Sequence, residues 1–532
     1  MAQSDQNDAG NWRGHYLVRQ GQAFPIIGAE VHNSSSSTVT GIHKSFRRVS
    51  DLGANTVLAP VAWNLLEPTE GTFDTALIDA MVSTARELGL ALIPLWFGTW
   101  KNAVSTYAPA WVKTDQERFP RAIGGGRRLE HLSAFSSDAK EADSRAFAAL
   151  MRRIREVDAD RTVIAVQVEN EIGLLGDTRD RGPLAEAAFA SAVPAAVLDA
   201  VAREETMPLH AEWRSAGASR HGSWAEVFPD GDRTDEAFMA SAFASYTEFV
   251  AAAGAQEHDV PLFVNAWLDA DSVLDGPVAL AGGKRPGDYP SGGPVIPVAA
   301  IWEALAPTLD FLAVDLYVAD AEPAFAAYRG RRGRLFIPEL RADVPGIAQM
   351  FSAIGGHRAL GVSPFGVDSF DLASPEAATL TDAYGLLRAA AALISANSEA
   401  PLHGFALDDA NPSVTLEFDD VVVTVHTRDE WGMYTPTYPG YGIAIQADGG
   451  VYVLGRGFWI TYASRDGREI GLLSADHYRP DRDGLTLVSR LNGDEAGSVI
   501  PFPFAGSPLV PGRAIPTRIP DGGITHLVTY TY

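Results

Sequence analysis

The sequence predicts a (β/α)₈ barrel followed by a smaller β-sandwich-like domain, and three observations support this fold class. Between about residue 22 and residue 395, short apolar runs of β character alternate with longer segments of helical period. Eight such runs can be placed. After a short break the residue pattern changes to alternating apolar and polar residues with turn signals. We therefore expect a barrel over residues 1–399 and a β-rich domain over residues 400–532.

The eight strands are expected at Phe24–His32, Asn55–Trp63, Leu90–Phe97, Thr162–Glu169, Pro261–Trp267, Phe311–Tyr317, Arg334–Glu339 and Leu360–Phe365. Continuous apolar strands between helices such as Thr75–Glu87 and Ala139–Glu156 are typical of a parallel sheet that is buried on both faces. A doubly wound sheet would look similar locally. Polar and aromatic residues gather at the strand ends, however, and barrel enzymes carry their chemistry on that rim.

The stretch 173–259 is too long for a simple connection between two strands. It carries helical patterns over residues 184–203 and 235–253, with a segment rich in Gly, Ser and Trp between them. We expect an excursion over the rim that shapes a substrate cleft.

Composition and charge exclude several classes of partner. A net charge of −25 repels a polyanion, so nucleic acid is not expected to bind. No apolar run approaches the length of a membrane span, and the polar, acidic N-terminus lacks the features of a secretory signal, so a cytoplasmic protein is expected. The twelve histidines show no HxH or HExxH spacing, and we expect neither a metal nor a cofactor. The sequence leaves the oligomeric state, including a homo-oligomer, open.

Two glutamates end predicted strands four and seven. In the run Val166–Gly173 an apolar strand ends on Asn170 and Glu171 and then breaks at a glycine, and Glu339 closes the run at residues 335–340. Hydrolysis of an acetal needs a proton donor for the leaving oxygen and a second carboxylate that takes up the positive charge at the anomeric carbon. The pair therefore predicts a glycosidase. We expect a carboxyl separation of about 5–5.5 Å, the spacing of a retaining mechanism.

With these motifs the chain resembles glycoside hydrolase family 35, a β-galactosidase family of retaining barrels, in a bacterial branch with an added C-terminal β domain. The resemblance implies that Glu171 is the general acid/base, that Glu339 is the nucleophile, that Asn170 contacts the sugar 2-hydroxyl and that Tyr317 steadies the nucleophile. Glu169 is expected to be structural.

Two positions depart from the family pattern. Leu66 stands where the family's second-strand motif has a histidine, and Thr99 stands where a glutamate contacts galactose, so galactose specificity is in doubt. Further sugar-binding candidates at strand ends and in adjoining loops are Glu30, His32, Asn33, Trp63, Asn64, Trp100 and Trp267.

The leading hypothesis is an exo-acting retaining β-glycosidase that releases a terminal galactose or glucose from an oligosaccharide or glycoside. A transglycosylase would use the same residues, and a barrel that only binds glycans would be expected to lack one of the two carboxylates. The second domain is interpreted as a buttress for the barrel, with a separate sugar-binding module as the alternative.

Overall fold

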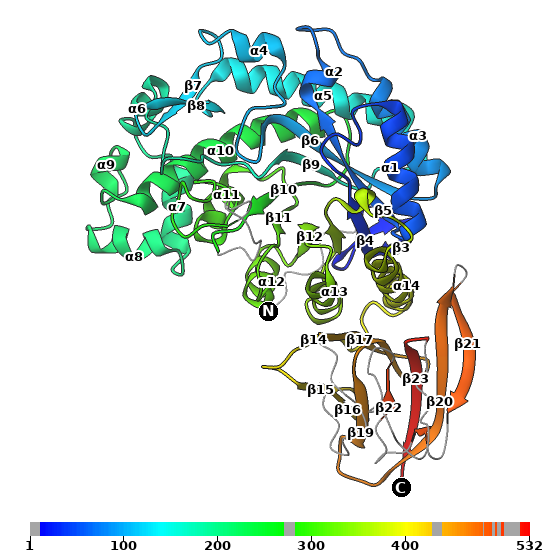
Figure 1. Cartoon of the computed structure of the whole chain (residues 1–532). Helices are drawn as coiled ribbons and strands as arrows, with labels where there is room; N and C mark the ends of the chain where they lie inside the picture. Colours follow the sequence, from blue (N-terminus) through cyan, green and yellow to red (C-terminus); the bar gives the residue numbers. More distant parts are fainter. Residues whose placement is uncertain are drawn as a thin grey trace.

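The computed structural model describes residues 11–270, 282–427, 439–481, 484–491, 495–496, 502–504 and 522–532. Eight parallel strands form the central sheet (Figure 1), in the order β11-β10-β9-β6-β5-β4-β13-β12. Their bounds are Ile26–Glu30 (β4), Thr56–Ala62 (β5), Ala91–Lys101 (β6), Val166–Asn170 (β9), Leu262–Trp267 (β10), Phe311–Asp315 (β11), Phe336–Leu340 (β12) and Gly361–Pro364 (β13).

The two outer strands of this order meet and close the sheet into a barrel. Leu316, just after β11, forms a parallel bridge with Leu340 of β12, and the Leu316 amide donates to the Glu339 carbonyl at 2.9 Å. Each of the eight strands lies within or overlaps a run that the sequence predicts, so the barrel prediction is confirmed. In chain order, β9 is the fourth barrel strand and β12 the seventh.

Helices cover the outside of the barrel, and their ends carry local sequence signals. Thr38 and Ser136 accept hydrogen bonds from the first turns of α1 and α5, and Gly53 ends α1 in the left-handed conformation. The helices that alternate with the barrel strands along the chain are α1 (Val39–Leu52), α3 (Ala76–Glu87), α5 (Ser137–Val157), α10 (Asp232–Ala255), α11 (Ala299–Leu305), α12 (Glu322–Arg329), α13 (Val344–Phe351) and α14 (Pro375–Ala396). Within the described ranges, no helix is both long enough and apolar enough to cross a bilayer.

The structure differs from the sequence expectation in three places. The helical pattern over residues 184–203 forms two helices, α6 (Pro183–Phe189) and α7 (Ala195–Arg203), because Pro194 cannot continue a helix that precedes it. Three short strands, β1 (Trp12–Arg13), β2 (Tyr16–Arg19) and β3 (Gln22–Phe24), precede the barrel. Strand β6 runs to Lys101, four residues beyond its expected end.

Other short elements connect the barrel units. They are α2 (Trp63–Leu66), α4 (Ala110–Thr114), α8 (Pro208–Ser215), α9 (Trp224–Val227) and the hairpin of β7 (Arg121–Gly124) and β8 (Arg127–Leu132).

Two antiparallel sheets follow α14. One contains β14 (Leu402–Leu407), β17 (Gly440–Ala447), β18 (Gly450–Arg456), β23 (Ile524–Thr531), β20 (Ile470–Asp481) and β21 (Gly484–Leu491), and the other contains β15 (Ser413–Glu417), β16 (Val421–His426), β19 (Trp459–Ser464) and β22 (Phe502–Pro503). Val423 and Ile460 from the smaller sheet share a buried cluster with Phe405 and Val453 from the larger one. The sheets therefore pack face to face, as expected for a sandwich.

The larger sheet also packs against the barrel (Figure 1), below α13 and α14 in this view. Tyr441, Ile443 and Leu454 belong to the same buried cluster as the apolar side chains of α14, and Arg456 of β18 pairs with Asp382 of α14 at 2.7 Å. These contacts favour the buttress interpretation. The exact division at residue 399 stays a prediction.

Candidate active site

The fourth barrel strand ends in a left-handed backbone. All residues of β9 are buried, and Glu169 and Glu171 have φ angles of 61° and 46°, which residues other than glycine rarely adopt. The Glu171 amide donates to Oδ1 of Asn265, at 3.0 Å, on the neighbouring strand β10. Strain of this kind persists only where the surroundings hold it, and it is concentrated at functional sites.

Glu171 is 3% exposed, and its environment favours the protonated form. Burial raises the pKa of Glu171 to about 8, and the nearby charge of Glu339 adds to the increase. Lys101 and a hydrogen bond with Asp315 act on this pKa in the opposite direction. A carboxyl group with this pKa still carries its proton at pH 7, as a general acid must.

Glu339 lies near the end of the seventh barrel strand and has a different environment. The Tyr317 hydroxyl donates a hydrogen bond to Glu339 Oε1, while Glu339 Oε2 is buried without a protein partner. Burial, followed by the charge of Glu339, raises the pKa of Tyr317, so the phenol keeps the proton that it donates. A donor on one oxygen stabilises the carboxylate and leaves the second oxygen available.

Two further carboxyl groups surround the pair. Glu30, at the end of β4, and Asp315, at the end of β11, are buried, and each has one oxygen without a partner. Burial and the charges of Glu339 and Glu171 raise both pKa values well above the usual range of carboxyl groups. Among the described residues, no three side chains of His, Asp or Glu are arranged to hold a metal ion.

Asn170 and Trp267 are two further residues of the candidate site. Both polar side-chain atoms of Asn170 are buried and unpaired, so the amide is free to bind a ligand. Trp267 shares a pocket of about 210 Å³ with Glu171, Asp315 and Tyr317. The indole N–H of Trp267 donates to the Gly282 carbonyl at 3.1 Å, which fixes the ring. A few polar groups that converge on one pocket are typical of ligand sites.

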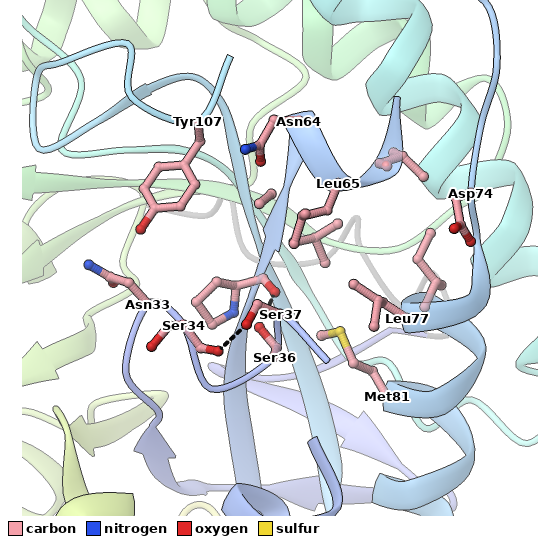
Figure 2. Close-up of a pocket in the computed structure, with 15 residues that line it drawn as sticks. Asn33, Ser34, Ser36, Ser37, Asn64, Leu65, Asp74, Leu77, Met81 and Tyr107 are labelled. Atoms are coloured by element: carbon pink, nitrogen blue, oxygen red, sulfur yellow. Dashed lines mark hydrogen bonds between the residues drawn. The ribbon is translucent and has the colours of Figure 1, made fainter. Parts of the chain in front are cut away.

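Asn33 and Asn64 line a different, larger pocket (Figure 2). Its empty volume is about 760 Å³, and it lies between the loop after β4, the end of β5 and helix α3. Leu77 and Met81 point into it from α3, and Tyr107 lies across from them. Oδ1 of Asn33 and Oδ1 of Asn64 are both buried and unpaired.

The remaining sugar-binding candidates have protein partners. Trp63 is fully buried, and its indole N–H donates to Glu67 Oε2 at 2.8 Å. Trp100 is equally buried, donates to Nδ1 of His131 at 3.2 Å and packs against the Tyr246 ring. Both indole N–H groups are thus bonded within the protein, and a role of Trp63 and Trp100 in sugar binding stays a prediction.

His32 also has contacts within the protein. Its ring packs edge-on against Phe365, and its backbone amide donates to Asp368 Oδ1 at 3.2 Å. A role of His32 in sugar binding stays a prediction.

Behind the site, Glu169 belongs to a buried network. Its carboxylate accepts hydrogen bonds from the Thr99 and Trp100 amides at 3.2 and 2.7 Å. The Thr99 hydroxyl donates to Asp143 at 2.6 Å and lies 2.7 Å from the Tyr246 hydroxyl. This arrangement fits the structural role that we expected for Glu169, and it commits Thr99 to the protein interior.

Sequence reasoning missed Lys101 and Asp315. Both are charged residues in otherwise apolar strands, and that pattern is the signal that could have identified them. Lys101 was overlooked because β6 was expected to end at Phe97. Asp315 lies inside the predicted run Phe311–Tyr317 and was not singled out.

Parts of the chain are similar to known proteins. Residues 380–503 match a domain of unknown function, DUF5597, and no curated protein matches the chain. Among solved structures, the chain is similar to the β-galactosidase of the psychrophilic Marinomonas ef1, with 14% identity, a TM-score of 0.45 and coverage of 69% of this chain and 60% of that one.

A second similar structure is the β-galactosidase of the Antarctic haloarchaeon Halorubrum lacusprofundi, with 14% identity, a TM-score of 0.47 and coverage of 68% of this chain and 58% of that one. The chain thus spans about 60% of the length of these two enzymes. Residues 16–215, which include Glu171 but not Glu339, match the model of glycosyl hydrolases family 35, so the expected relationship to that family is confirmed for this part of the chain.

Proposed function

We propose that the chain is an exo-acting β-glycosidase that works by double displacement, with Glu171 as general acid/base and Glu339 as nucleophile. The observation that carries the proposal is the contrast between the two carboxyl groups. Burial and a neighbouring charge keep a proton on Glu171, whereas Glu339 accepts a hydrogen bond on one oxygen and has the other unpaired. A protonated carboxyl group beside a second carboxyl group with a free oxygen is the arrangement that this reaction requires.

In the first step, Glu339 Oε2 attacks the anomeric carbon while Glu171 gives its proton to the departing glycosidic oxygen. The bond between that carbon and the leaving oxygen breaks, and a glycosyl ester of Glu339 remains. In the second step, Glu171, now a carboxylate, takes a proton from water as the water oxygen attacks the same carbon. The sugar then leaves with its anomeric configuration retained.

The substrate is expected to be a β-linked terminal hexose. Trp267, Tyr317 and Asp315 line a pocket together with Glu171, and aromatic rings beside carboxyl groups are suited to contact a sugar ring. We propose that Asn170 contacts this sugar. Asn33 and Asn64 line the separate, larger pocket, and we propose that they contact a more distant part of the substrate.

A panel of aryl β-hexosides and β-linked disaccharides tests the proposal, with the first-formed product followed by proton NMR. The product should be a monosaccharide of retained configuration. Glu339→Gln should abolish turnover, whereas Glu376→Gln, at an exposed position of α14, should leave it unchanged. Inverted product, or normal turnover by Glu339→Gln, would remove the assignment.

A further inference from the structure

Lys101 occupies a rigid position at the mouth of the barrel. It ends β6, and its backbone stands in register with Asn170 at the end of β9. The chain then turns through Asn102 and Ala103, with φ angles of 51° and 54°. The Lys101 and Val104 backbones exchange two hydrogen bonds, of 2.9 and 3.1 Å, across this turn. A left-handed pair of residues closed in this way is the tight turn that joins antiparallel segments, and it holds Lys101 in place.

The Lys101 side chain is a buried cation whose donors are not used by the protein. It is 5% exposed, and its ammonium lies 5.0 Å from the centre of the Phe97 ring. Across the ranges that the structure describes, no carboxylate oxygen lies within 4.0 Å of Nζ, and Nζ makes no hydrogen bond. A buried charge without a direct partner is costly to fold, so its presence beside the carboxyl groups of the candidate site indicates a function.

Four carboxyl groups surround this ammonium at longer range. Glu30, Glu171, Asp315 and Glu339 come from β4, the end of β9, β11 and β12, and all four act electrostatically on Lys101. Burial alone lowers the pKa of Lys101, but the combined field of these carboxylates outweighs burial and raises it. Lys101 therefore stays charged across the pH range in which a glycosidase works.

The lining around Lys101 contains acceptors that are also unpaired. One oxygen each of Glu30, Asp315 and Glu339 is buried without a hydrogen-bond partner, and so is the Asn170 amide. A sugar hydroxyl both accepts and donates. It can therefore accept a hydrogen bond from Lys101 and donate one to a neighbouring carboxylate, which satisfies two buried groups at once.

We propose that Lys101 binds the sugar directly, by donating a hydrogen bond to a ring hydroxyl, and that it is a specificity-determining residue of the pocket. This inference rests on the proposed glycosidase function and adds a substrate contact to it. The resemblance to family 35 would place a carboxylate contact at Thr99, but Thr99 is turned into the network with Asp143 and Tyr246. The end of the third barrel strand thus presents a donor, Lys101, instead of an acceptor.

A donor in place of an acceptor at this strand end changes which sugar hydroxyl the protein recognises. A donor fixed in the protein requires an acceptor on the sugar, and a substrate that lacks the hydroxyl leaves the ammonium unsatisfied. Sites that bind a substrate hydroxyl discriminate strongly against analogues without it, because a buried polar group is then left unpaired.

The test combines Lys101→Met with a set of deoxygenated substrates. The parent substrate is the aryl β-hexoside that the wild-type protein hydrolyses fastest, and the set comprises its 2-, 3-, 4- and 6-deoxy analogues. Loss of a hydrogen bond to a charged group predicts that Lys101→Met lowers kcat/KM on the parent about 10- to 100-fold. On the analogue that lacks the hydroxyl bound by Lys101, the same substitution should change kcat/KM less than about threefold.

Lys44→Met, on the exposed face of α1, is the matched control and should behave as the wild type on every substrate. An equal loss on the parent and on all four analogues would overturn the proposal, because Lys101 would then act only through the carboxylates. Unchanged activity of Lys101→Met would overturn it as well. If Lys101→Met does not fold, Lys101→Leu, which also lacks a donor, is measured against the same series and judged by the same criteria. Failure of the proposed function would look different, since the wild-type protein would then hydrolyse no glycoside.

Discussion

Replacing Glu171 by glutamine should stabilise the folded protein at pH 7. The pKa of Glu171 is raised from 4.5 to about 8 by burial and by the charge of Glu339, so the folded protein keeps this proton at pH 7 while the unfolded chain releases it. The carboxyl group of Glu171 is neutral when protonated, and its pKa is higher in the folded protein than in the unfolded chain. Such a group increasingly destabilises the folded protein as the pH rises from the pKa of the unfolded chain towards that of the folded protein. Glutamine is neutral in both states and avoids this penalty.

The magnitude follows from the pH interval. Between the ordinary pKa of 4.5 and pH 7 there are 2.5 pH units, and each unit corresponds to 1.36 kcal/mol, which gives a stabilisation of about 3 kcal/mol. Below pH 4.5 the carboxyl group is protonated in both states, so the stabilisation should vanish there. The same pKa predicts that activity of the wild-type protein falls above pH 8, as Glu171 loses the proton that the leaving group needs.

Urea unfolding of the wild type and of Glu171→Gln, followed by tryptophan fluorescence at pH 4.5 and pH 7, measures this difference. Glu376→Gln controls for the loss of one negative charge at the surface. The variant should be inactive on substrates with poor leaving groups and more stable only at the higher pH. Equal stability at pH 7, or a gain of the same size at both pH values, would refute the reasoning.

Two further substitutions test the surroundings of the pair. Tyr317→Phe removes the donor to Glu339 Oε1 and should lower kcat/KM about 10- to 100-fold, since hydrogen bonds to charged groups contribute roughly 1.5–3 kcal/mol. Steady-state kinetics measure the loss, a melting curve checks that the variant is folded, and an unchanged kcat/KM would count against a role for Tyr317. Gly98→Ala should destabilise the barrel by about 1–3 kcal/mol, because the added Cβ would lie 2.3 Å from Trp96 Nε1 and 2.7 Å from Glu169 Oε1. Urea unfolding measures the loss, and wild-type stability would show that the side chains around Glu169 can shift to admit the methyl group.

Much of the fold follows from local patterns in the sequence. Apolar runs of β character, separated by helical periods, predict the strands because burial on both faces demands apolar side chains throughout a strand. The carboxylates that end β9 and β12 stand out against these runs, and the eightfold repeat places them on one rim. Glu171 and Glu339 therefore stand out from the sequence as candidates for the catalytic pair.

The remaining features depend on contacts between distant segments. The pKa of Glu171 is set first by burial and then by Glu339, Lys101 and Asp315, which come from three other strands, and no spacing along the chain encodes their separation. Trp63 and Trp100 looked equivalent to Trp267 in the sequence, and the tertiary structure is what places Trp267 in one pocket with Glu171. Lys101 joined the site only because β6 extends to the rim. The sequence alone determined the barrel and its two carboxylates, because periodicity and residue type are local properties, whereas burial, charge and orientation around them are properties of the closed barrel.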